Sequence, residues 1–147
     1  MAVHFHTLKV KEVRSETPDC VSVLFDIPDL YKEDFRFEHG QNITIKKEID
    51  GEEVRRSYSI CSAPFENELR IAVKKVEAGR FSDFANTTLQ AGEELEVLPP
   101  TGKFNTALNI TNKKQYLAFA AGSGITPVIS IIKTTLQAEA ASSFTLV

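Results

Sequence analysis

Hydrophobic and polar residues alternate with a period of two along most of the first two-thirds of the chain, and turn-forming residues separate these stretches. Such alternation predicts half-buried strands. Six strands are expected, at Phe5–Val13, Cys20–Asp26, Asn42–Glu48, Val54–Ile60, Leu69–Val76 and Glu94–Leu98. Several short strands joined by turns favour a mainly β fold, either an antiparallel barrel or a sandwich.

One stretch within this region follows the period of a helix instead. The segment "GRFSDFANTTLQAG" places four apolar residues on one side, namely Phe81, Phe84, Ala85 and Leu89. Ser82 is the expected N-cap, and Gly92 is the expected end of the helix. The pattern therefore predicts one short helix among the strands.

The pattern changes after about Asn109. The run "QYLAFAA" is almost continuously apolar, which is typical of a strand covered on both faces, and "GSG" follows it. A helix is predicted next, with Thr126 at the N-cap and Pro127 at its first position. Its apolar stripe consists of Val128, Ile131, Ile132 and Leu136. With "SSFTLV" as a further strand, residues 109–147 predict the opening β-α-β of a parallel α/β domain, after a barrel domain at residues 1–108.

The apolar strands near the end of the chain have too little sequence around them to be covered. A single β-α-β opening cannot cover both faces of its own sheet. We therefore expect a truncated α/β domain, with apolar surfaces at residues 116–120 and 144–147 that favour association. The alternative is that this piece folds back on the barrel or pairs with another copy.

Composition and charge narrow the class of protein. The chain has 147 residues, 42% of them hydrophobic and 25% charged, with a net charge of −3 and no long basic run. These values are typical of a soluble globular protein and argue against nucleic acid or an anionic membrane as the main partner. Lys9, Lys11 and Glu12 interrupt any signal-peptide core, so a cytoplasmic location is expected.

Cysteines and histidines give no sign of a metal site. Cys20 and Cys61 form no C-x-x-C pair, and an iron–sulfur cluster would need about four thiolates. We interpret Cys61 as a small buried strand residue rather than a redox group. Three histidines are interpreted as surface or turn residues: His4, His6 and His39. Phe35 and Phe37 are expected in the core.

Three short motifs carry candidate chemistry. In "RRSYSICSAP", arginine offers a fork of donors suited to phosphate, and tyrosine offers a flat face for stacking. In "VKKVEAGRFS", a glycine and a serine precede a helix, whose free N–H groups attract phosphate. The third, "AAGSGITP", differs from G-x-G-x-x-G by having Pro127 at the last glycine position. Each motif alone is also compatible with an ordinary sheet face or helix start.

The order of the motifs is more specific than any one of them. Arg-x-Tyr-Ser, then Gly-x-x-Ser, then Gly-x-Gly-x-x-Pro resembles the ferredoxin–NADP⁺ reductase superfamily. The chain is most similar to reductase components of oxygenases, including the phenylacetyl-CoA oxygenase reductase type. The resemblance implies a six-stranded Greek-key FAD barrel followed by an NAD(P)H domain. A 2Fe–2S cluster is possible only in a missing C-terminal domain.

The resemblance also implies roles for individual residues. Arg56 would contact the FAD pyrophosphate, with Ser57 in the same binding set. Tyr58 would stack on the isoalloxazine ring, and Ser59 would hydrogen-bond near the flavin N5. Thr126 would face the flavin and the nicotinamide, which makes Ser59 and Thr126 the candidate catalytic residues.

Two further segments complete the implied site. Three positions would line the flavin and its ribityl or adenosine part, largely through the backbone: Val73, Lys74 and Val76. The pyrophosphate loop would comprise Gly79, Arg80, Phe81 and Ser82. The chain departs from the family at Asn42, where an aromatic residue is common, and this weakens the expected packing there.

The implied function is that of a flavin-dependent oxidoreductase. It would pass electrons from NAD(P)H through FAD to an iron–sulfur centre or ferredoxin of an oxygenase system. The alternative is a flavin-binding electron-transfer or regulatory module without its own NAD(P)H oxidation; a barrel without any cofactor is a third interpretation. The intact Arg-Ser-Tyr-Ser favours the enzyme. We expect residues 1–147 to hold FAD but to have no useful affinity for NAD(P)H.

Overall fold

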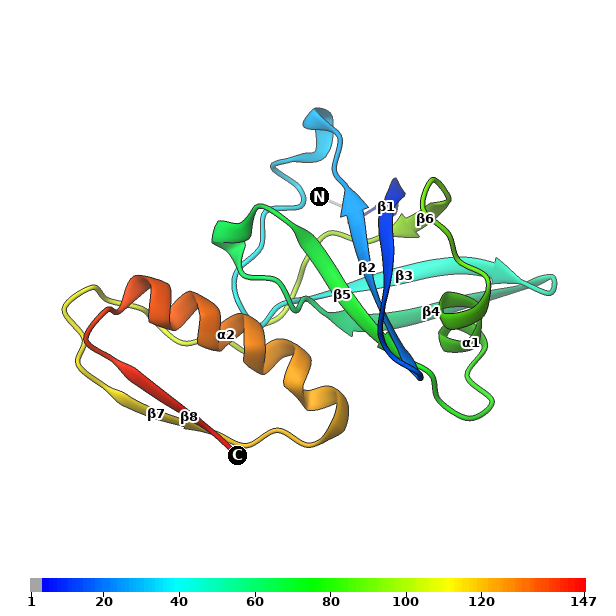
Figure 1. The fold of residues 1–147 in the computed structure, drawn as a ribbon. Coiled ribbons are helices and arrows are strands. Elements are labelled where there is room, and N and C mark those ends of the chain that lie inside the picture. Colours follow the sequence, from blue (N-terminus) through cyan, green and yellow to red (C-terminus); the bar gives the residue numbers. More distant parts are fainter. Residues whose placement is uncertain (1–3) are drawn as a thin grey trace.

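The computed structural model describes residues 4–147, and six of its strands form one antiparallel sheet. These strands are β1 (His6–Thr17), β2 (Cys20–Asp26), β3 (Asn42–Ile49), β4 (Glu52–Ser59), β5 (Leu69–Lys74) and β6 (Glu94–Val97). Their order in the sheet is β4-β3-β6-β1-β2-β5. A bridge between Ile60 and Ile71 joins the end of β4 to β5 and closes the sheet into the predicted barrel (Figure 1).

All six predicted strands are confirmed, with differences at their ends. β1 continues to Thr17, so that only Pro18 and Asp19 form the turn to β2. β5 stops at Lys74, two residues before the predicted end. Asp50 and Gly51 join β3 to β4 with positive φ angles of 53° and 76°. Two such residues match the twist of a tight hairpin and fix the register of β3 against β4.

The barrel interior is filled by the inward-facing residues of the alternating pattern. The most buried aliphatic residues are Leu8, Val10, Val23, Ile43, Ile45, Ile60, Ile71, Val73, Leu95 and Val97. The short helix α1 (Arg80–Thr87) adds Phe81 and Ala85 to this core, while Phe84 packs against it as a partly buried residue. Phe35 is buried and Phe37 is partly buried, as expected.

The predicted helix caps are wrong. α1 begins at Arg80 with Gly79 as its N-cap, because the Gly79 carbonyl accepts the first helical hydrogen bond, from the Asp83 N–H at 2.8 Å. Ser82 therefore lies inside the first turn. The helix ends at Thr87, well before Gly92, although Leu89 is still buried.

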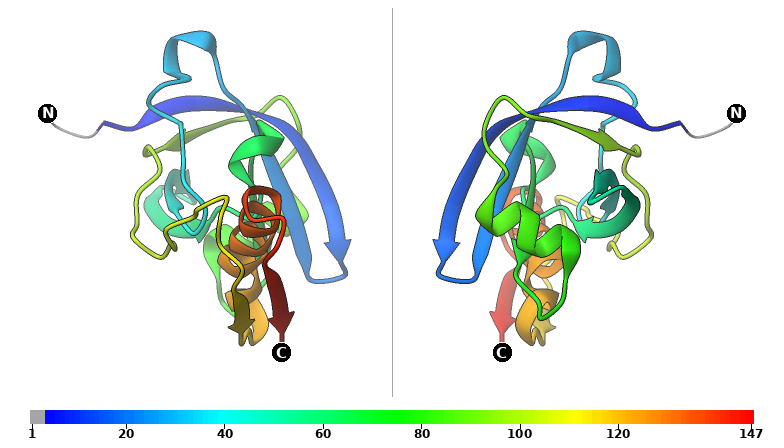
Figure 2. Two further views of the ribbon diagram at one scale, coloured as in Figure 1. Left: turned by 90° about the vertical axis from the view of Figure 1, so that its left-hand side faces the viewer. Right: turned by 90° about the vertical axis from the view of Figure 1, so that its right-hand side faces the viewer.

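The second part of the chain is a small parallel β-α-β unit, as predicted. β7 (Gln115–Ala118) pairs in parallel with β8 (Ser143–Leu146), and α2 (Ile125–Ala138) connects them. Helix α2 lies between the two strands and the barrel, and the strands project beyond it (Figures 1 and 2). Within residues 4–147, no helix has the length and apolar character needed to cross a membrane.

Helix α2 differs from the prediction at its start and in its buried face. A short 3-10 turn, η3 (Gly122–Gly124), precedes it, and Gly124 rather than Thr126 is the N-cap. Of the predicted stripe only Val128 is buried, and Leu136 is 42% exposed. A polar contact between α2 and the barrel adds to the buried Val128: the buried Ser130 hydroxyl donates to the Ser62 carbonyl at 2.7 Å.

The apolar strand β7 is covered on one side only. Leu117 is 60% exposed and Phe119, just after the strand, is 72% exposed, in agreement with the expectation that this chain has too little sequence to cover both faces. On the other face, the Tyr116 ring stacks on Phe144 of β8 with centroids 5.2 Å apart. The expected uncovered apolar surface is therefore present on one face of the two strands.

The segment that joins the two parts is tied to the turn before β3. The Nε2 atom of His39 lies 3.1 Å from the Thr106 carbonyl oxygen, and Asn105 donates to Glu38 at 2.7 Å. His39 lies in a turn, as expected, but is buried rather than on the surface. The domain boundary at residues 108 and 109 stays a prediction.

A buried carboxylate holds the β-α-β unit together. Glu139, directly after α2, accepts hydrogen bonds from Asn112, Tyr116 and Ser142 and from the backbone N–H of Asn109. Burial alone would raise its pKa, but these donors lower it to about 2. The carboxylate thus links the end of α2 to the segment before β7.

Replacing Glu139 with glutamine should loosen this unit without affecting the barrel. Because the folded-state pKa lies below the usual value of 4.5, the stabilisation is complete above pH 4.5 and fades as the pH falls toward 2. The protection factors of β7 and β8 against hydrogen exchange, which are corrected for the intrinsic pH dependence of exchange, should be lower in Glu139→Gln and should no longer change with pH between these limits. The exposed Glu48→Gln serves as the control. Unchanged exchange in β7 and β8 would contradict the assigned role.

Candidate functional site

A cavity of about 710 Å³ lies where β4, the end of β5, the start of α1 and the turn before α2 meet. We call it the β4 cavity. Most of the predicted site residues line it: Arg56, Ser57, Tyr58, Ser59, Lys74, Val76, Gly79, Ser82 and Thr126. The fold therefore brings together residues that are up to 70 positions apart in the sequence.

The alternation along β4 places Tyr58 over the core. Val54 and Ile60, which share its face of the strand, are buried, and Tyr58 itself is partly buried. Its ring centroid lies 5.7 Å from that of Phe81, with the rings tilted by 42°. Burial raises the pKa of the Tyr58 phenol. The phenol therefore stays neutral. Because the ring packs against the buried Phe81, it presents a flat surface in the wall of the cavity.

The β4 cavity is positively charged. Arg56 and Lys74 line it, and neither forms an ion pair within residues 4–147. The Arg56 Nη1 donates to the Arg55 carbonyl at 2.7 Å. Among the residues that the structure describes, no carboxylate belongs to the lining. An anionic group entering this cavity would therefore meet two available cations and no opposing charge.

The loop before α1 is held by the Ser82 side chain. The Ser82 hydroxyl accepts the Val76 N–H at 3.2 Å and donates to the Gly79 carbonyl at 3.1 Å. A Cβ atom at Gly79 would lie 2.3 Å from the Ser82 Oγ, so only glycine fits there. Ser82 thus shapes the loop that forms the edge of the cavity.

Three predicted site residues do not reach the cavity with their side chains. Val73 is fully buried in the barrel core, and Phe81 is 1% exposed beneath Tyr58. Neither residue belongs to the lining of the β4 cavity. Arg80 turns away from the β4 cavity and forms an ion pair with Glu52 at the start of β4.

Several lining residues were not anticipated from the sequence. Thr17 and Cys20 lie in the cavity because Cys20 of β2 is the register partner of Lys74 in β5. Burial raises the pKa of the Cys20 thiol. Ala72 is a further unanticipated lining residue, whereas Gly122, Ser123 and Ile125 belong to the "AAGSGITP" motif, although no role was assigned to them individually. Thr17 and Cys20 lie in the cavity because of strand pairing, and the sequence alone does not show which strands pair.

Other candidate residues lie outside the β4 cavity. Cys61 is partly buried, donates through its thiol to the Arg70 carbonyl at 3.4 Å, and has a pKa raised by burial. Asn42 exchanges backbone hydrogen bonds with Thr101. In the described part of the chain, no group of three or more His, Cys, Asp or Glu side chains could hold a metal ion.

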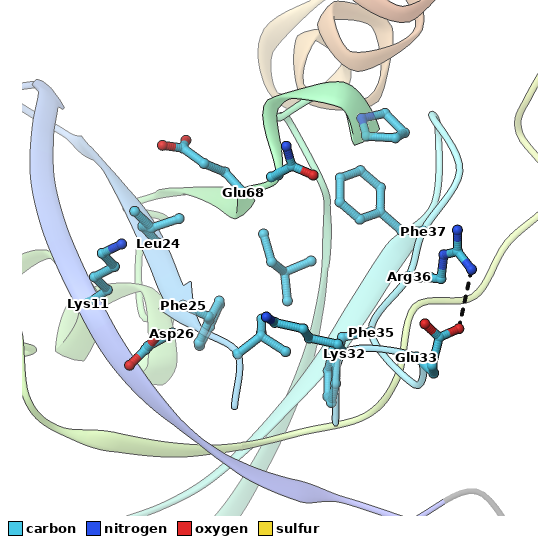
Figure 3. A pocket seen from close by; sticks show the side chains of 14 residues that line it. Lys11, Leu24, Phe25, Asp26, Lys32, Glu33, Phe35, Arg36, Phe37 and Glu68 are labelled. Carbon is cyan, nitrogen blue, oxygen red and sulfur yellow. Dashed lines mark hydrogen bonds and ion pairs between the residues drawn. The ribbon is translucent and has the colours of Figure 1, made fainter. Parts of the chain in front are cut away.

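A second cavity, of about 600 Å³, lies at the opposite end of β2 and β5 (Figure 3). Its lining mixes the cations Lys11, Lys32 and Arg36 with carboxylates, and Arg36 is paired with Glu33 at 3.2 Å. None of the predicted site residues lies there. The β4 cavity, with available cations and no carboxylate, is therefore the better site for an anionic ligand.

Comparisons with known proteins agree with this geometry. A family model described as "Oxidoreductase FAD-binding domain" matches residues 7–106. The chain is 48% identical over 143 residues to a subunit of the 1,2-phenylacetyl-CoA epoxidase of Escherichia coli K12, covering 97% of this chain and 40% of that protein. It is 39% identical over 131 residues to the ferredoxin reductase component of 3-ketosteroid-9-alpha-monooxygenase of Rhodococcus rhodochrous, covering 88% and 36%.

A solved structure shows the same fold. Phthalate dioxygenase reductase superposes with a TM-score of 0.75 at 31% identity, covering 97% of this chain and 42% of that one. That protein is described as a modular structure for electron transfer from pyridine nucleotides to a 2Fe–2S centre. The chain spans about two-fifths of the length of the curated relatives that it matches.

Removing the Ser82 hydroxyl should loosen the loop at the edge of the cavity. Ser82→Ala leaves the Val76 N–H without its acceptor, which should lower the free energy of unfolding by about 1 kcal/mol. Hydrogen exchange at Val76 should be faster, and urea unfolding gives the stability change. Ser15→Ala, on an exposed part of β1, is the control. Wild-type exchange at Val76 would show that the hydroxyl does not hold the loop.

Proposed function

Because the chain belongs to the oxidoreductase FAD-binding domain family, we propose that it holds FAD in the β4 cavity as part of an NAD(P)H-dependent reductase. The observation that carries this proposal is the cavity itself, in which two available cations, no carboxylate and a fixed tyrosine face line one space. A ligand that has both phosphates and a flat ring suits all of these features. The cavity volume of about 710 Å³ is also within the usual range for cofactor sites.

The charged residues fit the phosphates of FAD. Arg56 would hold the pyrophosphate through charge-assisted hydrogen bonds, and Lys74 would add a second positive charge. The start of α1, with Gly79 as its N-cap, lies at the same edge of the cavity. Free N–H groups at a helix start attract phosphate, so this edge is the proposed pyrophosphate position.

The remaining lining residues fit the ring. Tyr58 would stack on the isoalloxazine and exclude water from one of its faces. Ser59, the last residue of β4, would donate a hydrogen bond near N5, with Thr126 on the facing wall. FAD supplies the redox chemistry when bound, accepting a hydride and releasing single electrons. The chain binds the ring, orients it and excludes water.

The electron partners are proposed from the relatives. Phthalate dioxygenase reductase transfers electrons to a 2Fe–2S centre, and two of the curated relatives belong to an epoxidase and a monooxygenase. We therefore propose an iron–sulfur domain or ferredoxin as the acceptor and an oxygenase component as the final partner. A cytoplasmic location is proposed as well.

The basic experiment is to identify the bound flavin. A purified protein with flavin absorbance, whose released cofactor has the mass of FAD, supports the proposal; FMN would correct the cofactor. A colourless protein that binds neither flavin would favour a barrel without a cofactor. In a protein that contains the whole nucleotide domain, NADH-dependent reduction of the bound flavin separates the reductase from an electron-transfer or regulatory module without its own NAD(P)H oxidation.

Arg56→Ala should weaken FAD binding by about 1.5–3 kcal/mol, the range for a hydrogen bond to a charged group. The measurement is a titration of the flavin-free protein. Arg55→Ala is a matched control, because Arg55 lies on the other face of the same strand and pairs with Glu53 at 2.7 Å. Equal losses in the two variants would mean that general charge, and not the position of Arg56, controls binding.

Ser59→Ala should retain FAD but slow flavin reduction by NAD(P)H in a protein that contains the whole nucleotide domain. Loss of one donor near N5 should lower the rate by about tenfold or more, because the donor no longer follows the changing charge. Stopped-flow absorbance gives the rate. A wild-type rate would remove Ser59 from the catalytic residues.

A further inference from the structure

A third cavity adjoins the β4 cavity at the loop before α1. It has a volume of about 760 Å³, and we call it the loop cavity. Val76 and Gly79 line both cavities, so the two spaces meet at this loop. The proposed pyrophosphate position lies at the same place. A ligand longer than the β4 cavity would therefore extend past Gly79 into the loop cavity.

The two cavities differ in charge. Four carboxylate residues line the loop cavity, namely Asp19, Asp50, Glu77 and Asp83. Its two cations already have partners: Lys75 pairs with Asp83 at 2.9 Å, and Arg80 pairs with Glu52. Both cations of the loop cavity are therefore paired with carboxylates, whereas those of the β4 cavity are not.

Arg80 pairs with one anion in the structure, Glu52, and lies beside the proposed position of a second, the pyrophosphate. It is the first residue of α1 and follows Gly79 directly, so its backbone is at the proposed pyrophosphate position. Its side chain reaches instead to Glu52, the first residue of β4, at the end of the β3–β4 hairpin. Both side chains are substantially exposed, 44% for Arg80 and 68% for Glu52. Exposed ion pairs are weak, so this one is easily exchanged for another anion.

We propose that Glu52 sets the affinity for FAD by competing with the cofactor's pyrophosphate for Arg80. The inference rests on the proposed function, since it concerns the same cofactor. When FAD binds, Arg80 leaves Glu52 and turns to the phosphate nearer the adenosine. Arg56 lies in the β4 cavity and holds the phosphate nearer the flavin. Glu52 therefore affects the binding of the dinucleotide FAD and not the binding of the mononucleotide FMN.

The test compares FAD with FMN in the flavin-free protein, using the change in flavin fluorescence to measure both dissociation constants. Glu52→Gln keeps the shape of the side chain and removes its charge. It should tighten FAD binding by about two- to fivefold, the range for an exposed ion pair, and leave FMN binding unchanged. In an Arg80→Gln background, the same change should have no effect on FAD binding.

Glu53→Gln is the matched control. Glu53 lies next to Glu52 on the same strand, carries the same charge and pairs with Arg55 rather than Arg80. An equal gain in Glu53→Gln, or a gain that persists with Arg80→Gln, would overturn the proposal in favour of a general charge effect. Unchanged or weaker FAD binding in Glu52→Gln would also overturn it. A wild-type protein that binds neither flavin would instead remove the proposed function.

Discussion

The site depends on the closure of the barrel between Ile60 and Ile71. This bridge joins the last strand of one side of the sheet, β4, to the last strand of the other, β5. Without it, Tyr58 and Ser59 on β4 would not face Lys74 on β5 across one cavity. Both isoleucines are fully buried, so the hydrophobic effect that fills the barrel also sets the distance between the two walls of the site.

Much of the fold could be predicted because period-two alternation is a strong signal in this chain. All six barrel strands and the parallel β-α-β unit were expected at nearly their observed places. The helix N-caps differ from the prediction because glycines, Gly79 and Gly124, occupy the N-cap positions without a side-chain cap, whereas the prediction relied on the hydroxyls of Ser82 and Thr126. The buried face of α2 was also mistaken. A hydroxyl such as Ser130 becomes a contact residue only when a carbonyl like that of Ser62 lies opposite, and the sequence does not show this.

The candidate site was predictable where a motif forms continuous cavity wall, as in Arg56, Ser57, Tyr58 and Ser59. The position of a motif side chain was less predictable where a residue from a distant part of the sequence offers it another partner. Arg80 belongs to the expected loop, yet Glu52 lies within reach because the hairpin folds back next to α1. Cys20 entered the lining through strand pairing with Lys74. Both cases depend on contacts between distant parts of the sequence, which local patterns do not specify.

The turn before β3 bears on how this protein could be recombined with its relatives. Gly40 has a φ angle of 85°, and a Cβ atom there would lie 1.6 Å from the carbonyl oxygen of Phe104, in the segment that leaves the barrel. The path of that segment is therefore set by a residue more than sixty positions earlier. A chimera that takes the segment from Phe104 onward from a relative, with Gly40 left in place, would separate two surfaces that fit each other. Exchanging residues 38–41 together with the new segment would keep the fit.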